Sequence, residues 1–370
     1  MSLPSITLAG SLSCSALGFG TMGLGGKFER DATNDAEAIR ILHRALDLGI
    51  TLFDTAEVYG AGHSEEILGA ALKGRRANVV IATKFNAANS GTDSMIAACE
   101  ASLRRLGTDT IDLYQTHWPN PAIPVEETAA GFVHLVTSGK ARAIGFSNAT
   151  TALMRKLTAL LPAGFPVATS QQEYNLAERF VERSILPYCR DQGMQLLAYS
   201  PLGQGKLAQS PVLATLATTY QTTPAALALQ WLRRQPNTIP IPMTSKIDNL
   251  EKNIAAFTHA LPDAALVALD QHFARTVMEI PVQAIHVVGT LSGKAYTTLA
   301  DARANTLSLS PSPTELAREL ADGDMLKPVK VRPKAGQAGT YDLYEGQLRY
   351  WAWRIAHDDR LPIVAQVTEA

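Results

Sequence analysis

The chain has 370 residues, more than a single hydrophobic core usually organises, so two domains are expected. Apolar residues make up 46%, charged residues 18%, and the formal net charge is −1. This composition excludes a disordered or collagen-like chain and a strongly basic nucleic-acid-binding protein. The apolar runs fall short of the roughly 20 residues that a membrane span needs, and the first residues lack a signal-peptide pattern. We therefore expect a cytoplasmic protein without membrane contact.

Short aliphatic runs alternate with stretches of helical period up to about residue 275. The expected strands cover residues 16–20, 51–54, 79–83, 111–116, 141–146, 168–172, 195–199 and 238–241. The expected helices cover 36–48, 65–72, 93–106, 125–137, 151–160, 178–192 and 224–234. Eight alternating units within about 250 residues predict an α/β fold, a closed (β/α)8 TIM barrel over residues 1–275.

Polar residues stand at the carboxyl ends of the expected strands, where TIM barrels carry their active sites. They are Asp54, Lys84, His117, Ser147, Asn148 and Ser200. Any one of them alone is more simply a capping or surface residue, but six at equivalent positions indicate a site. The three widely spaced cysteines (Cys14, Cys99 and Cys189) predict neither disulfides nor a metal site.

Tyr59 follows Asp54 by five residues, so a loop could bring its hydroxyl over the barrel mouth. An ammonium from Lys84 would favour the phenolate and ease release of the tyrosine proton, and Asp54 would hold Lys84 in place. His117 could orient a carbonyl oxygen. These groups suit protonation of a carbonyl oxygen while a hydride reaches its carbon. Trp118, Met22 and Phe85 are candidate apolar walls.

The order of motifs resembles the aldo-keto reductase superfamily over nearly three quarters of the chain. The matching segments are 17–25, 54–60, 64–69, 83–84, 112–117 and 145–148. The resemblance implies NADPH-dependent reduction of a small aldehyde or ketone. It also implies a catalytic tetrad of Asp54, Tyr59, Lys84 and His117, with Tyr59 as general acid.

The same resemblance implies a cofactor site. Ser147, Asn148 and Gln171 match positions that bind the nicotinamide carboxamide, and Tyr199 matches the ring that stacks on it. The loop contacts to the pyrophosphate and the other expected cofactor contacts are Gly20, Thr21, Met22, Ser200, Leu202, Gly203, Gln204 and Gly205. The Gly-x-Gly-x-x-Gly at residues 18–23 overlaps the expected strand 16–20 and does not follow a strand, so a Rossmann site is not supported.

The segment 239–253 resembles the family's adenosine-phosphate site. Thr244, Ser245 and Lys246 are the candidate phosphate contacts, and Asn253 is the candidate for the adenine. Met243 and Asn249 stand where many members carry basic residues. One cation and two hydroxyls still favour a 2′-phosphate, so we predict NADPH, with NADH as the alternative.

The composition changes after residue 273, and we place a domain boundary near residue 276. Residues 276–370 resemble the α+β N-terminal domain of ParB-type partition proteins, a fold shared with sulfiredoxin. Gly346 and Arg349 keep two positions of that family's phosphate-binding box, which implies an anion site for a nucleotide or DNA. Gln347 occupies the position of sulfiredoxin's reactive cysteine, which excludes its thiol chemistry. A module used only for packing or partner binding is the alternative.

Two further functions remain open at this point. The barrel could sense the redox state of a nicotinamide cofactor for a regulatory protein, or the chain could be a plasmid or mobile-element partition factor. The complete tetrad favours catalysis, because a sensor needs no proton donor.

Overall fold

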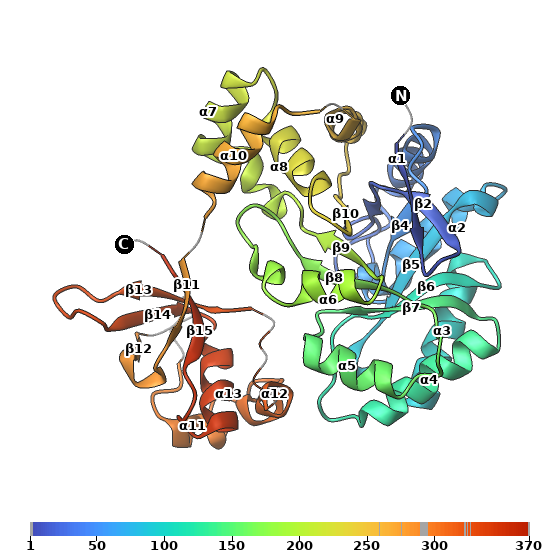
Figure 1. Cartoon of the computed structure of the whole chain (residues 1–370). Helices are drawn as coiled ribbons and strands as arrows, with labels where there is room; N and C mark the ends of the chain where they lie inside the picture. Colours follow the sequence, from blue (N-terminus) through green and yellow to red (C-terminus); the bar gives the residue numbers. More distant parts are fainter. Residues whose placement is uncertain are drawn as a thin grey trace. The chain divides into compact units, whose positions relative to one another are not determined.

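The computed structural model describes residues 3–258, 260–274, 276–288, 295–321, 323, 325 and 327–368. The chain divides into two compact units (Figure 1). The first comprises Met1–Ala149 and Met154–Phe273, and the second comprises Ala274–Ala370 with Thr150–Leu153. Within the described ranges, no helix is both long and apolar enough to cross a bilayer.

The first unit is built on parallel strands that follow one another in chain order around the sheet (Figure 1). Among the described residues these are β3 (Phe19–Gly20), β4 (Leu52–Asp54), β5 (Val80–Phe85), β6 (Ile111–Thr116), β7 (Ala141–Ser147), β8 (Val167–Glu173), β9 (Gln195–Tyr199) and β10 (Thr238–Pro240). Two backbone hydrogen bonds close the ring, from Gly18 N to Pro240 O and from Gly20 N to Pro242 O, both 3.0 Å. The predicted (β/α)8 barrel is therefore confirmed.

Helices follow the strands and cover the outside of the barrel. They are α1 (Asp35–Asp47), α2 (His63–Leu72), α3 (Thr92–Leu106), α4 (Val125–Thr137), α5 (Thr151–Ala159), α6 (Ile185–Asp191), α7 (Pro211–Thr219), α8 (Pro224–Arg233), α9 (Ile247–Thr258) and α10 (Asp263–His272). Local sequence explains several ends: the side chains of Ser210 and Thr223 cap α7 and α8, each followed by proline. Gly107 ends α3 in the left-handed conformation, at φ 63°.

A β-hairpin precedes the barrel, formed by β1 (Ser5–Leu8) and β2 (Leu12–Ser15). The apolar side chains of Leu8, Leu12 and Cys14 pack against the interior of the barrel, in one cluster with residues such as Val80 and Leu113. The hairpin thus covers the amino ends of the strands. A cavity of about 430 Å³ lies beside it, at the opposite end of the strands from the polar residues that the sequence singled out.

The second unit contains a mixed sheet in the order β11-β15-β13-β14-β12. Its strands are β11 (Thr276–Ile280), β12 (Ile285–Val287), β13 (Val329–Pro333), β14 (Tyr341–Glu345) and β15 (Ile363–Val367). Its helices are α11 (Leu299–Arg303), α12 (Pro313–Leu320) and α13 (Gln347–His357), which lie on one face of the sheet (Figure 1). A capping box between Ser312 and Glu315 starts α12.

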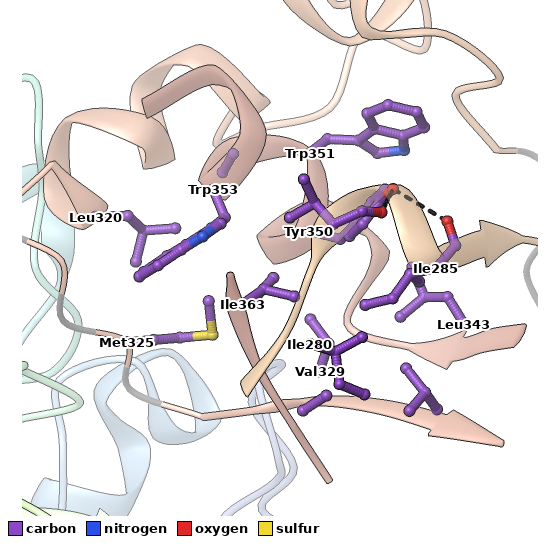
Figure 2. Close-up of a cluster of buried hydrophobic side chains, with 14 of the residues drawn as sticks. Ile280, Ile285, Leu320, Met325, Val329, Leu343, Tyr350, Trp351, Trp353 and Ile363 are labelled. Atoms are coloured by element: carbon purple, nitrogen blue, oxygen red, sulfur yellow. Dashed lines mark hydrogen bonds between the residues drawn. The ribbon is translucent and has the colours of Figure 1, made fainter. Parts of the chain in front are cut away.

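The core of the second unit lies between its sheet and its helices. Figure 2 shows Tyr350 of α13 directed toward Ile285 and Trp353 of α13 beside Leu320, and strand residues such as Val329 and Ile363 belong to the same buried cluster. The hydroxyl of Tyr350 donates to the carbonyl oxygens of Val282 and Ile285, at 3.0 and 3.2 Å. This unit therefore has a hydrophobic core of its own, and the buried hydroxyl of Tyr350 is hydrogen-bonded to the turn that leads into β12 and to the first residue of that strand.

Candidate active site

A buried ion pair lies at the carboxyl ends of β4 and β5. The ammonium of Lys84 donates to Asp54 Oδ2 at 2.8 Å and to the carbonyl oxygen of Thr55 at 2.7 Å. Lys84 is 0% exposed and Asp54 is 3% exposed. Both side chains therefore lie inside the barrel mouth, and the expected pairing of Asp54 with Lys84 is present.

Tyr59 begins the short 3-10 helix η1 (Tyr59–Gly62), which follows β4. Positive φ angles at Gly60, Ala61 and Gly62 turn the chain sharply there. The Lys84 nitrogen lies 5.1 Å from the centre of the Tyr59 ring. The His117 ring meets that of Tyr59 edge to face, with centroids 5.6 Å apart. The structure thus brings all four predicted tetrad residues together.

Burial governs the ionisation of this cluster. It raises the pKa of Tyr59, and the charge of Lys84 lowers that pKa only in part, so the net shift is upward rather than toward the phenolate. Burial opposes the charged form of Lys84, but Asp54 and Tyr59 outweigh it and the pKa of Lys84 is raised. Burial, and then Lys84, lower the pKa of His117 to about 3. At neutral pH the site therefore holds a protonated tyrosine, an ammonium and a neutral histidine.

A second buried network supports the strand that carries Lys84. Glu65, on α2, accepts from the hydroxyl of Thr83 at 2.5 Å and from Arg105 Nε at 2.6 Å. Glu65 and Thr83 are 0% exposed. Neither residue was among the site residues predicted from the sequence. Side chains alternate along a strand, so Lys84 faces the interior while Thr83 faces the helices.

The same alternation corrects the expectation for Phe85. Its ring packs against Tyr114 and against Phe132 on α4, and it is fully buried. Phe85 therefore faces the helices and does not line the barrel mouth. Trp118 and Met22 are 50% and 36% exposed and remain available to a ligand.

The residues expected at the nicotinamide lie at the ends of neighbouring strands. Asn148, at φ 54°, donates from Nδ2 to the carbonyl oxygen of His117 at 2.9 Å and accepts from the hydroxyl of Tyr199 at 2.9 Å. Ser147 lies beside it, at 3.2 Å from the same Nδ2. Gln171 donates from Nε2 to Asp54 Oδ1 at 2.7 Å. Amide, hydroxyl and aromatic groups thus converge next to the tetrad, a donor and acceptor set that fits a carboxamide-bearing ring.

The expected pyrophosphate loop leaves β9. Positive φ angles occur at four of its residues, namely Ser200, Gly203, Gln204 and Gly205, and Leu202 is half-buried between them. Gly20 lies at the barrel rim, where a Cβ atom would come within 3.1 Å of the Ile241 carbonyl oxygen. Thr21 is fully buried, and its hydroxyl accepts from Ser64 at 2.8 Å. The Thr21 hydroxyl is therefore hydrogen-bonded inside the protein and does not face a ligand.

The expected adenosine segment leaves β10, which pairs with β9. Thr244 Oγ1 accepts from the backbone N–H of Lys246 at 3.1 Å, while Ser245 and Lys246 are exposed just before α9. Asn253, on α9, is 7% exposed. Two hydroxyls and one ammonium therefore stand near a helix start, which fits an anion. Over the described residues, histidine, cysteine and carboxylate side chains form no cluster that could hold a metal ion.

Comparison with known proteins agrees with this geometry. The model of the Aldo/keto reductase family matches residues 16–274. The chain is similar to the methylglyoxal reductase YeaE of Escherichia coli (strain K12), with 36% identity over 72% of this chain and 94% of that protein. It is also similar to probable aldo-keto reductase 1 of Glycine max, with 35% identity over 68% of this chain and 83% of that protein.

A solved structure gives the same result. The crystal structure of an aldo/keto reductase from Klebsiella pneumoniae in complex with NADP and acetate has 33% identity and a TM-score of 0.68, covering 73% of this chain and 95% of that one. The matched residues, the barrel and the buried cluster at its mouth agree, and the chain belongs to the aldo/keto reductase family.

Proposed function

We propose that this chain reduces a small aldehyde or ketone to an alcohol with NADPH, and that Tyr59 is the general acid. The chain is an NADP-dependent oxidoreductase. The observation that carries the proposal is the buried Asp54–Lys84 pair beside the Tyr59 ring. The E. coli relative is a methylglyoxal reductase and the K. pneumoniae relative is complexed with NADP, which supports a small carbonyl substrate and this cofactor.

NADPH, when bound, supplies the hydride that reaches the carbonyl carbon. Tyr59 is protonated at neutral pH, with its pKa raised further by burial, and gives its proton to the carbonyl oxygen as negative charge develops there. Lys84 stabilises the tyrosinate that remains, and Asp54 keeps the ammonium in position. His117 is neutral, so it orients the carbonyl oxygen through a hydrogen bond rather than a charge.

The same site supports the proposed cofactor contacts. Ser147, Asn148 and Gln171 would bind the carboxamide, and Tyr199 would stack on the ring. The loop contacts would be Gly20, Thr21 through its backbone, Met22, Ser200, Leu202, Gly203, Gln204 and Gly205. Thr244, Ser245 and Lys246 would hold the 2′-phosphate, and Asn253 the adenine. If Lys246 contributes, Lys246→Ala weakens NADPH binding more than NADH binding. The cytoplasmic location stays a prediction.

Steady-state NADPH oxidation against a panel of aldehydes, ketones and quinones tests the chemistry. Tyr59→Phe should lose most turnover, by about 100-fold or more, while it still binds NADPH. Tyr114→Phe is the matched control, because Tyr114 is a second buried tyrosine with no hydrogen-bond partner for its hydroxyl among the described residues. Retained turnover in Tyr59→Phe would refute the acid assignment. Cofactor binding without turnover on any carbonyl would favour the redox-sensing function instead.

For the second unit, we propose a ParB/sulfiredoxin-like module that binds a nucleotide or another phosphate-bearing ligand at the start of α13. Gly346, at φ 93°, joins β14 directly to α13, and a helix N-terminus after such a turn favours anions. The Gln347 amide nitrogen is buried with no hydrogen-bond partner among the described residues. Arg349 donates from Nη2 to the Pro328 carbonyl oxygen at 3.3 Å, which holds its guanidinium near this turn.

Titration of full-length protein with ATP, CTP and a DNA duplex tests this module. A ligand held here should be lost in Arg349→Ala and in Gly346→Val, while NADPH binding to the barrel stays unchanged. Lack of binding by the wild type would leave a module that serves packing or a protein partner.

A further inference from the structure

Asp54 makes a second hydrogen bond that the tetrad does not account for. Its Oδ2 accepts from Lys84, whereas its Oδ1 accepts from the side-chain amide of Gln171 at 2.7 Å. Gln171 is 2% exposed and stands 117 residues further along the chain. In the sheet order, three strands separate its strand β8 from β4, so this bond spans the inside of the barrel.

The bond fixes which atom of Gln171 remains for a ligand. A carboxylate only accepts hydrogen bonds, so the amide nitrogen of Gln171 must face Asp54. The carbonyl oxygen of Gln171 is then the atom left for the cofactor, and it can only accept a hydrogen bond. A nicotinamide carboxamide offers an N–H donor, and this orientation would favour one face of the ring.

We propose that Gln171 is a positioning residue that connects the nicotinamide site to the proton donor, through Asp54 and Lys84. This proposal rests on the proposed function. With both carboxylate oxygens held, the plane of the Asp54 carboxylate is fixed, and the Lys84 ammonium is fixed with it between Asp54 Oδ2 and the Thr55 carbonyl. Lys84 in turn lies 5.1 Å from the centre of the Tyr59 ring.

The hydrogen bond from Gln171 to Asp54 should lower the pKa of Tyr59. The negative charge of Asp54 raises the pKa of Tyr59, in opposition to Lys84. The Gln171 N–H partly neutralises that charge, so its removal should raise the Tyr59 pKa further. The other titratable groups that face Tyr59 are Lys84, Asp54, the neutral His117 and Tyr199.

Two substitutions at one position separate this role from simple packing. Gln171→Met keeps the length of the side chain and removes the donor. Gln171→Glu can donate to Asp54 only when it is protonated. Gln172→Met is the matched control, because Gln172 is 1% exposed on the same strand but bonds to the Ala149 carbonyl oxygen and to Ser170.

The experiment measures the pH profile of kcat for carbonyl reduction in full-length protein. For Gln171→Met we expect a roughly tenfold lower kcat and an alkaline limb displaced to higher pH, since tyrosine must be protonated to act. For Gln171→Glu we expect kcat to recover toward acid pH. The control should keep the wild-type profile. A profile in Gln171→Met that overlays the wild type would overturn the proposal.

A second readout does not depend on turnover. The titration of Tyr59 is obtained from ultraviolet phenolate absorbance, as the difference between each protein and its Tyr59→Phe counterpart. Its midpoint should move upward in Gln171→Met and stay in place in Gln172→Met. If the wild type reduced no carbonyl, the proposed function would fail while this titration still decided the role of Gln171. An unmoved midpoint in Gln171→Met would overturn it.

Discussion

Replacing Lys84 with methionine should destabilise the barrel strongly, because the change breaks a buried ion pair from one side. Lys84 is 0% exposed and its partner Asp54 is 3% exposed. Among the residues that the structure describes, the variant leaves the Asp54 carboxylate with its side-chain hydrogen bond from Gln171, in an interior that penalises an unpaired charge. Breaking a buried pair in this way costs about 3–5 kcal/mol. A surface pair such as Lys140–Glu100, with side chains 29% and 43% exposed, contributes far less because solvent screens it.

Urea unfolding followed by circular dichroism measures these free energies. Lys84→Met should lower the free energy of unfolding by about 3–5 kcal/mol, and Lys140→Met should lower it by a much smaller amount. The double variant Asp54→Asn/Lys84→Met should recover most of the loss, because neither charge remains, and should still be inactive. Two results would contradict this prediction: Lys84→Met as stable as Lys140→Met, or a double variant no more stable than Lys84→Met. Either result would mean that an unpaired Asp54 charge in the interior is not what destabilises Lys84→Met.

Two further predictions concern pH. The pKa of His117 falls from 6.5 to about 3 through burial and then Lys84, so only the unfolded chain binds that proton between these values. Stability should therefore decline as pH drops through this window, and His117→Gln should flatten the decline in urea midpoints; an unchanged slope would contradict it. Burial raises the pKa of Glu319 from 4.5 to about 7, so the folded chain keeps a proton that the unfolded chain releases. Stability of the second unit should fall as pH rises through that window, and Glu319→Gln should unfold at higher urea than wild type at pH 8, whereas equal midpoints would argue against this burial.

Local patterns predicted most of the barrel. Helix 125–137 and strands 111–116 and 195–199 have the expected bounds, because long apolar periodicity and buried aliphatic runs are strong signals. The hairpin of β1 and β2 was missed although Ala9 and Gly10 separate two short alternating segments, and both residues have positive φ. Helix α7 was missed as well, although Ser210 followed by Pro211 is a helix-start pattern.

The candidate site was predictable only as a set of residues. The alternation of strands and helices was enough to predict that Asp54, Lys84 and His117 lie together, because the parallel strands of a barrel end on one face. The bond between Gln171 and Asp54 was not predictable, since no local pattern says which strands face each other across the interior. The net upward shift of the Tyr59 pKa was missed for the same reason, because it depends on burial by residues from other elements.

Inside the barrel, an apolar layer of side chains contributes to stability and a charged layer contributes to the chemistry. Toward the amino ends, apolar side chains such as Leu52, Val80 and Leu197 pack under the hairpin and supply hydrophobic stabilisation. Toward the carboxyl ends, the buried Asp54–Lys84 pair is costly to desolvate, so the layer below must compensate for it. That same desolvation raises the pKa of Tyr59 further above neutrality, so its proton moves only as a carbonyl oxygen gains charge, and Lys84 then stabilises the tyrosinate. A substitution that let water into the mouth would therefore relieve the charge pair and lower the pKa of Tyr59 toward its ordinary value at the same time.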